Sequence, residues 1–271
     1  ALLADFLAAG GASEAALQTW ADWLALCPED DAALLAVARL HGLRGDRERQ
    51  LEALRAAVEF NPNLADEQRY LDWLQADQQP FYLAFALDGA AVVAADQGPP
   101  PDAGPSQDPL HHLLRHRVIK AFANGTTSEY VHQITRVLRE EGAQRFANWR
   151  LPHWSGTQRA RLLSCTVRRA DGGVEHPRLD GAWVAIRSLQ PGDIVELAGR
   201  VDDLAPSFFG TYFGLEHDFT SPDGAPVARA LLTVVTTPGR DYRWQARGGA
   251  PEPVIAPLAG GEQRYDWEMN G

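Results

Sequence analysis

Apolar residues in the first eighty positions recur at spacings of three and four, a pattern typical of amphipathic helices. Residues 11–30 and 45–64 align at a constant offset of 34, and apolar positions mostly meet apolar positions of similar size. In both segments the helix is expected to stop at a proline, Pro28 or Pro62. Residues 32–43 predict a partner helix between them. The chain therefore begins with a helical repeat.

The repeat resembles the tetratricopeptide family, whose period is about 34 residues and whose unit is two helices. His41 and Gly42 depart from it, because they stand where the family usually has an aromatic and a small residue. Residues 1–9 are expected to be the second half of an earlier helix, and residues 67–76 a closing helix. Since about three repeats are usually needed for stability, we expect an array cut short upstream, within a piece of a longer protein. A generic stack of helical hairpins is the alternative.

From residue 110 the apolar period changes to about two, which indicates strands. Asn124-Gly125 and Asp171-Gly172-Gly173 are hairpin signals, because their residues accept positive φ. Further strand-like runs are residues 194–201 and 230–237. Repeated strands with turn signals and no helical pattern between them predict an antiparallel sandwich or barrel.

The stretch between the two halves has a mixed character. Residues 81–95 are apolar and fit a strand or a helix equally. Residues 98–109 carry five prolines and two glycines, which predicts a linker or an exposed loop. We therefore expect an α+β multidomain chain, with a helical (tetratricopeptide-like) repeat module at 1–80, a connecting segment at 81–109 and a mainly antiparallel β-sandwich at 110–271.

The charge balance narrows the choice of partners. With 36 acidic and 25 basic residues, the chain carries a formal net charge of −11. This argues against binding to duplex nucleic acid or anionic membranes, since both need a basic surface. Residues 1–80 hold 14 acidic and 6 basic side chains, which favours a partner with basic segments. No uncharged stretch approaches the ~20 apolar residues that span a bilayer, so no membrane insertion is expected. The compartment stays open.

Five motifs follow one another in the second half of the chain. They are YVHQITRVLREEGAQRF (130–146), CTVRRADGGVEHPR (165–178), LQPGDIVEL (189–197), FFGTYFG (208–214) and YDWEM (265–269). In this order they resemble a bacterial domain of unknown function that typically precedes a transglutaminase-like, papain-fold domain. Helical repeats upstream also occur in that family.

The resemblance implies an all-β, sandwich-like fold for residues 110–271 and a hydrolase-type domain after Gly271. The family's catalytic cysteine, histidine and aspartate would lie in that later domain, so none is assigned in this chain. Pro191-Gly192-Asp193 also fits a turn on physical grounds, because proline fixes φ, glycine accepts positive φ and aspartate accepts backbone N–H groups. The residues that match the family pattern are structural: Gly142, Gly172, Pro191, Gly192, Asp193 and Trp267.

Candidate nucleophiles and metal ligands are few. Cys27 and Cys165 fall at positions that predict buried, unreactive thiols, and neither has a credible histidine base. His112 and His116 are four residues apart, but on a strand four residues span roughly 13 Å and the two rings cannot share an ion. A solvated strand edge is expected for them.

Neighbouring carboxylates occur at 140–141 and 202–203, and we expect solvated turn acids there rather than a glycosidase pair. Neither a Gly-rich phosphate loop nor a G-x-S-x-G motif is present in the sequence. No cofactor is therefore expected.

Binding is the expected role. In the helical module, three residues are expected to face a partner groove: Arg39, Gln68 and Asp72. In the second half, the aromatic run at 208–213 cannot all face one core from a strand. The candidates for an exposed aromatic surface are Phe209, Tyr212 and Trp244. We expect a non-catalytic scaffold whose sandwich positions substrate for a transglutaminase-like domain, with a carbohydrate- or polymer-binding sandwich as the alternative.

Overall fold

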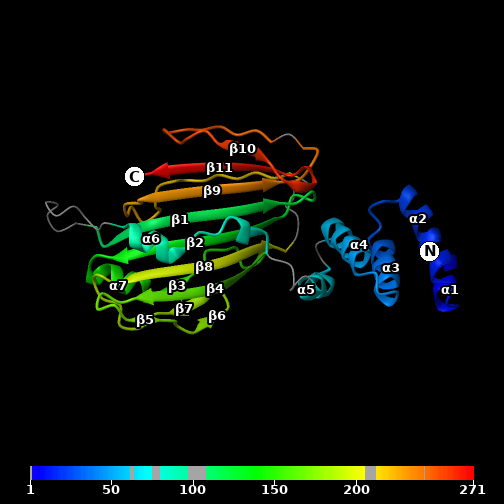
Figure 1. Cartoon of the computed structure of the whole chain (residues 1–271), viewed down its shortest axis with the longest axis horizontal. Helices are drawn as coiled ribbons and strands as arrows, with labels where there is room; N and C mark the ends of the chain where they lie inside the picture. Colours follow the sequence, from blue (N-terminus) through cyan, green and yellow to red (C-terminus); the bar gives the residue numbers. More distant parts are fainter. Residues whose placement is uncertain (1, 62–63, 75–79, 97–107, 205–211, 241) are drawn as a thin grey trace. The chain divides into compact units, whose positions relative to one another are not determined.

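In the computed structural model, the chain forms two compact units (Figure 1). Residues 1–80 build the first from helices, and residues 81–203 and 212–271 build the second around a large sheet. The structure describes residues 2–61, 64–74, 80–96, 108–204, 212–240 and 242–271. The chain is thus an α+β protein with N-terminal helices and a large, mostly antiparallel sheet. No helix within these ranges is long and apolar enough to cross a membrane.

The helices described in the first unit have bounds that repeat. They are α1 (Leu2–Ala9), α2 (Ser13–Leu26), α3 (Asp31–Leu43), α4 (Arg47–Phe60) and α5 (Ala65–Leu74). One constant offset separates the starts and the ends of α2 and α4, the starts of α3 and α5, and the ends of α1 and α3. It is the offset that aligns the apolar positions of the sequence, so the repeat in the pattern is also a repeat of the helix ends.

Local sequence signals set these helix ends. Asp30 and Asp46 cap α3 and α4, because each side chain accepts a hydrogen bond from the backbone N–H three residues on, at 3.0 and 3.2 Å. Gly11 and Gly45 follow α1 and α3 and have φ of +77° and +74°. This left-handed conformation ends a helix, and glycine adopts it without steric cost.

Small residues let these helices pack closely. Ala4 and Ala38, which occupy equivalent positions of the repeat, are buried, and Trp20 packs with Ala4 in one apolar cluster. Cys27 was expected to be buried but is exposed. It is the C-cap of α2, and its backbone N–H donates to the carbonyl of Trp23 at 2.9 Å. The prediction for Cys27 was wrong because the residue follows the last turn of the helix instead of lying on its packed face.

An eight-stranded sheet is the centre of the second unit. In spatial order its strands are β10 (Val254–Pro257), β11 (Gln263–Asn270), β9 (Arg229–Thr236), β1 (Leu110–Ala121), β2 (Thr127–Val137), β8 (Ile194–Asp203), β4 (Gln158–Arg168) and β5 (Val174–Glu175). Neighbouring strands are antiparallel except β1 and β9, which run parallel. The sheet is therefore mixed, with one parallel strand pair among antiparallel pairs.

Both hairpins expected from turn signals are present. Gly125, with φ of +84°, lies in the turn between β1 and β2, and Gly172, with φ of +92°, lies in the turn between β4 and β5. In each case glycine supplies the positive φ that a tight hairpin turn requires.

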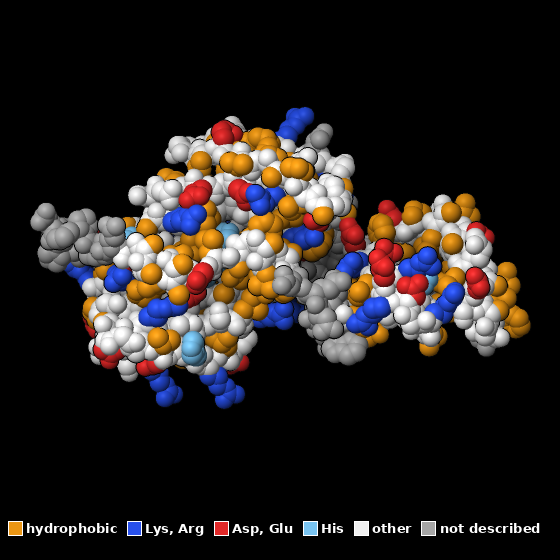
Figure 2. All heavy atoms as spheres, viewed as in Figure 1, with side chains coloured by type: hydrophobic (Ala, Val, Ile, Leu, Met, Phe, Trp, Pro, Cys, Tyr) orange, Lys and Arg blue, Asp and Glu red, His pale blue; other side chains and the backbone are white. Residues whose placement is uncertain are grey.

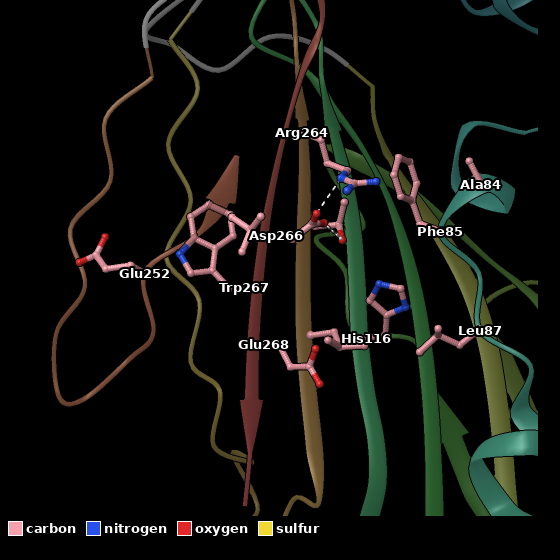
Figure 3. Close-up of a pocket in the computed structure, with 12 residues that line it drawn as sticks. Ala84, Phe85, Leu87, His116, Glu252, Arg264, Asp266, Trp267 and Glu268 are labelled. Atoms are coloured by element: carbon pink, nitrogen blue, oxygen red, sulfur yellow. Dashed lines mark hydrogen bonds and ion pairs between the residues drawn. The ribbon is translucent and has the colours of Figure 1, made fainter. Parts of the chain in front are cut away.

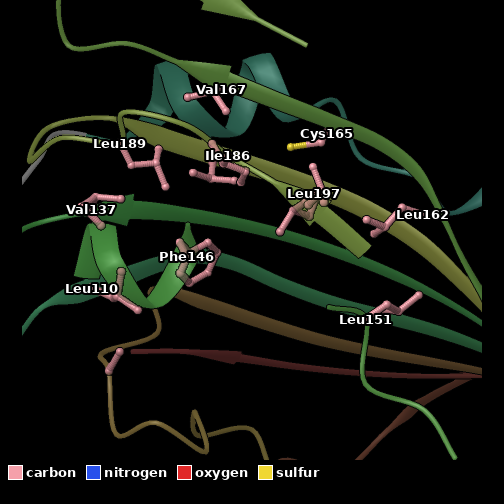
Figure 4. Close-up of a cluster of buried hydrophobic side chains, with 14 of the residues drawn as sticks. Leu110, Val137, Phe146, Leu151, Leu162, Cys165, Val167, Ile186, Leu189 and Leu197 are labelled. Atoms are coloured by element: carbon pink, nitrogen blue, oxygen red, sulfur yellow. The ribbon is translucent and has the colours of Figure 1, made fainter. Parts of the chain in front are cut away.

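A short helix and a small sheet cover one face of the large sheet. They are α7 (Glu140–Phe146) and the strands β3 (Asn148–Arg150), β6 (Leu179–Asp180) and β7 (Trp183–Ala185). Phe146 and Ile186 from this layer pack with Leu197 of β8 in the main apolar core (Figure 4). The expected two-sheet sandwich is not confirmed in that form, because the second sheet has three short strands and a helix shares its face.

The opposite face carries the segment that reads equally as strand or helix. It forms η1 (Phe81–Ala84) and α6 (Gly89–Ala95), so the helical alternative holds. Tyr82 stacks on Tyr130 of β2, with ring centroids 4.3 Å apart. Val131, the next residue of β2, packs with the main core, and because side chains alternate along a strand, Tyr130 lies on the other face. The segment is therefore part of the sheet unit.

Candidate functional site

An open hollow of about 450 Å³ lies on the sheet unit, where β1, β9 and β11 meet the segment before α6 (Figure 3). The side chain of Phe85 lines one side. The polar lining residues on the three strands are His116 from β1, Thr233 from β9, and Arg264, Asp266 and Glu268 from β11. The hollow thus brings an imidazole, a hydroxyl, a guanidinium and carboxylates together.

The period of the strands explains why these groups converge. β11 is paired with β9 along its whole length, and β9 is paired with β1. Along β11, Arg264, Asp266 and Glu268 alternate with Tyr265 and Trp267, so charged groups take one face and aromatic groups the other. Figure 3 shows Arg264 and Asp266 on one side of β11 and the indole of Trp267 on the other.

An ion pair forms one wall of the hollow. Arg264 Nε lies 2.6 Å from Asp266 Oδ2, and both side chains are about one-third exposed. Thr233 Oγ1 donates to the other carboxylate oxygen of Asp266 at 2.8 Å. The guanidinium also lies 5.8 Å from the centroid of the Phe85 ring, within the range of a cation–π contact. These contacts hold two opposite charges in place while leaving both accessible from solvent.

Two further carboxylates lie at the outer side of the hollow. Arg229 Nε donates to Glu268 Oε1 at 2.9 Å, and this hydrogen bond lowers the pKa of Glu268. Trp244 Nε1 donates to Glu252 Oε2 at 2.7 Å. Acidic and basic side chains are interspersed over the visible face of the sheet unit (Figure 2). The lining of the hollow is more acidic than basic, since it holds three carboxylates and one guanidinium.

His116 lines the hollow but is 3% exposed. Its Nδ1 atom is buried and has no hydrogen-bond partner among the described residues. Burial, with smaller contributions from the nearby His132 and Arg229, lowers the pKa of His116 to about 4. The ring is therefore neutral at pH 7 and offers a nitrogen that can accept or donate a hydrogen bond.

A polar chain runs beside His116 beneath α6. His132 Nε2 lies 3.0 Å from Glu196 Oε1, and Arg168 donates to the other oxygen of Glu196 at 2.6 Å. The bond with His132 lowers the pKa of Glu196, and the bond from Arg168 adds to the effect. A Cβ atom on Gly89 would overlap the Glu196 carboxylate. Glycine at the first position of α6 therefore lets the helix approach this partly buried charge.

Stability is expected to fall in acid because of His116. Its pKa is 6.5 in an ordinary environment and about 4 in the fold, so the unfolded chain takes up the proton first as pH falls. The stabilisation is complete above pH 6.5 and is lost as pH approaches 4. It amounts to about 3 kcal/mol. Urea unfolding at pH 7 and pH 4 should show a smaller loss for His116→Asn than for the unchanged chain.

The control for this prediction is His176→Asn. His176 is exposed near β5, so its replacement should leave the steep acid dependence in place. Equal pH dependence in the unchanged chain and in His116→Asn would show that the His116 ring gains its proton as easily in the fold as in the unfolded chain.

The prediction of a solvated strand edge for the histidines was wrong. β1 lies between β2 and β9, so it is an inner strand, and His112 is 2% exposed. His112 Nδ1 lies 2.9 Å from Thr135 Oγ1, and its Nε2 lies 3.3 Å from Asp223 Oδ1. Within the described ranges no group of three or more His, Cys, Asp and Glu side chains could hold a metal ion.

The paired carboxylates are also placed differently from the expected turns. Glu140 and Glu141 form the first turn of α7, where negative charge is favoured by the helix dipole. Asp202 and Asp203 end β8, where they accept hydrogen bonds from Ser128 Oγ at 2.6 Å and from Thr127 N at 2.8 Å. These acids stabilise local structure, and the two pairs come from different elements.

The candidate binding residues are divided between the two units. Arg39 is exposed on α3, and Gln68 is half-buried on α5. Asp72 lies in α5, but its side chain is outside the described residues, as is the whole of Phe209. Tyr212 is 63% exposed and Trp244 is 44% exposed. Of these, Trp244 is next to the hollow, through its bond to Glu252.

The motif residues lie at turns and close contacts. Gly192 has φ of +96°, and Asp193, which is 2% exposed, accepts hydrogen bonds from the backbone N–H groups of Ala170 and Gln190, both at 3.0 Å. Arg169 Nη1 donates to Asp193 at 2.8 Å. Pro191 begins this turn in sequence. The Asp193 carboxylate therefore fastens the turn before β8 to the end of β4.

The remaining thiol is unsuited to nucleophilic attack. Cys165 is buried in the main core, and burial raises its pKa to about 11. A thiolate is the reactive form of cysteine, and at neutral pH this group is protonated and shielded from solvent.

Sequence reasoning missed the hollow, because its residues lie on three strands that are distant in sequence. One signal was available. Residues 264–268 read Arg-Tyr-Asp-Trp-Glu, so charges and aromatics alternate with the period of a strand. A core strand rarely carries three charges on one face, and this pattern marks an accessible, charged face.

Comparisons with known proteins give a partial match. Residues 179–271 match the model of a Domain of Unknown Function with a solved structure (DUF3857). This is about a third of the chain and includes β8, β9, β10 and β11. No protein with a curated description matches the sequence.

Solved structures resemble the chain at low identity. A putative protease from Parabacteroides distasonis shares 11% identity at a TM-score of 0.46, over 60% of this chain and 35% of that one. An M1 zinc metallopeptidase from Deinococcus radiodurans shares 12% identity at a TM-score of 0.32, over 60% of this chain and 40% of that one. The chain thus spans well under half the length of these proteins.

Proposed function

We propose that the chain is a non-catalytic binding module. Its helical repeats bind a protein or peptide with basic segments, and its sheet unit positions substrate for a transglutaminase-like domain. One observation carries the first part: the helix ends repeat at the same constant offset as the apolar pattern. Stacked repeats of this kind, tetratricopeptide-like in period, form an extended surface that binds polypeptides.

Charge and exposure support the binding role of the helices. Residues 1–80 carry 14 acidic and 6 basic side chains, which attracts basic partners over a distance. Arg39 is exposed and offers a donor to carboxylate or carbonyl groups of a partner. A bound peptide would therefore combine general attraction to the acidic unit with local contacts at α3 and α5.

Two observations support the positioning role of the sheet unit. Asp193 and Cys165, whose side chains could in principle react, have structural roles instead. Asp193 holds a turn in place and Cys165 packs in the core. The match of residues 179–271 to a domain of unknown function agrees with the motif resemblance to a domain that precedes transglutaminase-like domains. A hollow whose described lining contains neither cysteine nor serine fits a role in holding substrate.

A second candidate function rests on exposed aromatic side chains. Trp154 is 78% exposed, Tyr212 63%, Trp244 44% and Trp183 40%. Exposed rings of this kind can stack on a sugar or another polymer. In this alternative the sheet unit is a carbohydrate- or polymer-binding domain.

Salt dependence and paired variants separate the two functions. The experiment is a pull-down from lysate at low and at high salt. It compares the unchanged chain with two double variants, Arg39→Ala/Gln68→Ala and Tyr212→Ala/Trp244→Ala. Helical recognition predicts weaker binding at high salt, because charges are screened beyond ~10 Å at 0.1 M. It also predicts loss in the Arg39→Ala/Gln68→Ala form, at about 1–2 kcal/mol for each important residue.

The aromatic variant is the matched control. Under the proposed function it should bind as the unchanged chain does. Binding that resists salt and is lost only in Tyr212→Ala/Trp244→Ala would favour the polymer-binding alternative instead.

A further inference from the structure

Half of β11 has an open edge. β11 pairs with β9 from Gln263 to Asn270, but with β10 only from Gln263 to Asp266. In the part of the chain that the structure describes, no strand pairs with the outer edge of residues 267–270. Pro251 and Pro253 stand just before β10, and proline cannot donate to a strand ladder. The sequence therefore stops β10 before it can cover this edge.

The unpaired main-chain groups can be identified from the alternation of the ladder. Gly271 N donates to Ala228 O at 3.0 Å, on the β9 side. In an antiparallel pair, alternate residues direct both main-chain groups toward the same neighbour, so the odd-numbered residues of β11 face β9. The N–H and C=O groups of Glu268 and Asn270 therefore point to the open edge, and an added strand would pair with them.

The hollow adjoins this edge. Its lining includes Trp267 and Glu252 on one side of β11 and Asp266 and Glu268 on the other (Figure 3). A lining on both sides is what an uncovered strand edge produces. A residue added opposite Glu268 would share the charged face of β11, because directly opposite side chains lie on the same face.

The charges that line the hollow determine which kind of side chain would bind there. Three carboxylates and the Arg264 guanidinium line it, and Arg229 pairs with one of these carboxylates. Carboxylates therefore outnumber guanidinium groups by one, and a cation is favoured. The side chain of His116, a residue only 3% exposed, lines the same hollow, and its Nδ1 atom lacks a partner among the described residues. This ring belongs to β1, which β9 separates from β11, so it bounds the inner end of the hollow.

We propose that an extended segment of another polypeptide adds as a strand beside residues 267–270 of β11 and places a lysine or arginine side chain in the hollow. This deepens the proposed binding function, since it names the ligand class of the sheet unit. The mode is strand addition, in which main-chain bonds supply affinity and alternate side chains supply specificity. A second copy of this chain is disfavoured at this edge, because pairing two copies would bring their Glu268 carboxylates near one another.

A synthetic peptide tests the proposal with the full chain. The probe is a fluorescein-labelled peptide of alternating valine and threonine with one central lysine, and its affinity is measured by fluorescence anisotropy. A matched peptide with central glutamate should bind roughly tenfold more weakly, since it meets carboxylates in place of a cation. Equal affinity of the two peptides would overturn the assignment of the hollow.

N-methylation of the peptide tests the strand pairing without altering the protein. Methyl groups on alternate residues remove the N–H groups that face β11, whereas methyl groups on the intervening residues block only the outer edge. One of the two sets should abolish binding, and the other should leave it within about twofold. Binding that is equally sensitive to both sets would overturn the proposal.

Two protein variants locate the site. Glu268→Gln should reduce the preference for lysine over glutamate several-fold. Glu175→Gln, which changes another arginine-paired glutamate on β5 at the opposite edge of the sheet, should not. Equal effects of the two would place the peptide elsewhere. The helical pull-down changes Arg39 and Gln68, whereas this test changes Glu268 and Glu175, so the two results can fail independently.

Discussion

Asp193→Ala is expected to destabilise the sheet unit by about 3–5 kcal/mol, because it removes the buried half of an ion pair with Arg169 and leaves two backbone N–H groups without their acceptor. Asp193 receives bonds from Arg169 and from two backbone N–H groups, of Ala170 and Gln190. Its side chain is 3% exposed and that of Arg169 is 14% exposed. Urea unfolding at pH 7, followed by tryptophan fluorescence, measures the loss.

Glu175→Ala is the matched control. Glu175 contacts the same guanidinium with both carboxylate oxygens, at 3.1 and 2.6 Å, but its side chain is 57% exposed. Exposed ion pairs contribute about 0–1 kcal/mol, so the control should change stability little. Similar losses in both variants would mean that burial does not set the contribution of Asp193.

Gly142→Ala is expected to destabilise the sheet unit by about 3 kcal/mol, at the upper end of the range for overpacked sites. Gly142 lies in α7 against the start of β1. A Cβ atom there would overlap the carbonyl oxygen of Pro109. That oxygen accepts hydrogen bonds from the backbone N–H groups of Leu138 and Arg139, so it cannot move without breaking them. Thermal and urea unfolding measure the effect.

Gly156→Ala provides the comparison for Gly142→Ala. A Cβ atom at Gly156 would have no atom of the described structure within 4 Å, and no positive φ restricts this residue. Its replacement should be neutral or slightly stabilising, because alanine lowers the entropy of the unfolded chain. If Gly142→Ala were equally neutral, α7 would not press against β1 as closely as the structure has it.

The sequence predicts well those elements whose ends are set by residues close to them in the chain. The helix ends of the first unit follow from nearby aspartate caps and from Gly11 and Gly45. The hairpins at Gly125 and Gly172 follow from turn residues that lie between adjacent strands. In each case, the signal and its structural consequence lie within a few residues of one another.

The misplaced residues have causes that are remote in sequence. His112 and His116 look polar enough for a solvated edge, but β1 gains a second neighbour when β9 pairs with it. The sequence of β1 itself carries no signal of its pairing with β9. The segment at 81–95 was ambiguous because its apolar residues pack on a finished sheet surface, where a short helix and a strand could each bury them.

The candidate site was beyond sequence reasoning for the same reason. The aromatic residues chosen for exposure, Tyr212 and Trp244, are exposed, because an excess of aromatics over the available core can be counted from sequence. The hollow needs His116 to meet Arg264 and Asp266, and these residues come together only through the order of the strands. The alternating charges of β11 can be seen in the sequence, but the residues of β1 and β9 that lie beside them cannot be predicted from it.

The parallel pairing of β1 with β9 has a consequence for the nascent chain. β1 is complete at Ala121, but the partner for its second edge extends to Thr236. During synthesis at about 5–20 residues per second, this edge waits several seconds for its neighbour. A strand with one open edge is a template for pairing with other chains. Slow translation between these two strands should therefore increase aggregation, and a chaperone that shields β1 in that interval should reduce it.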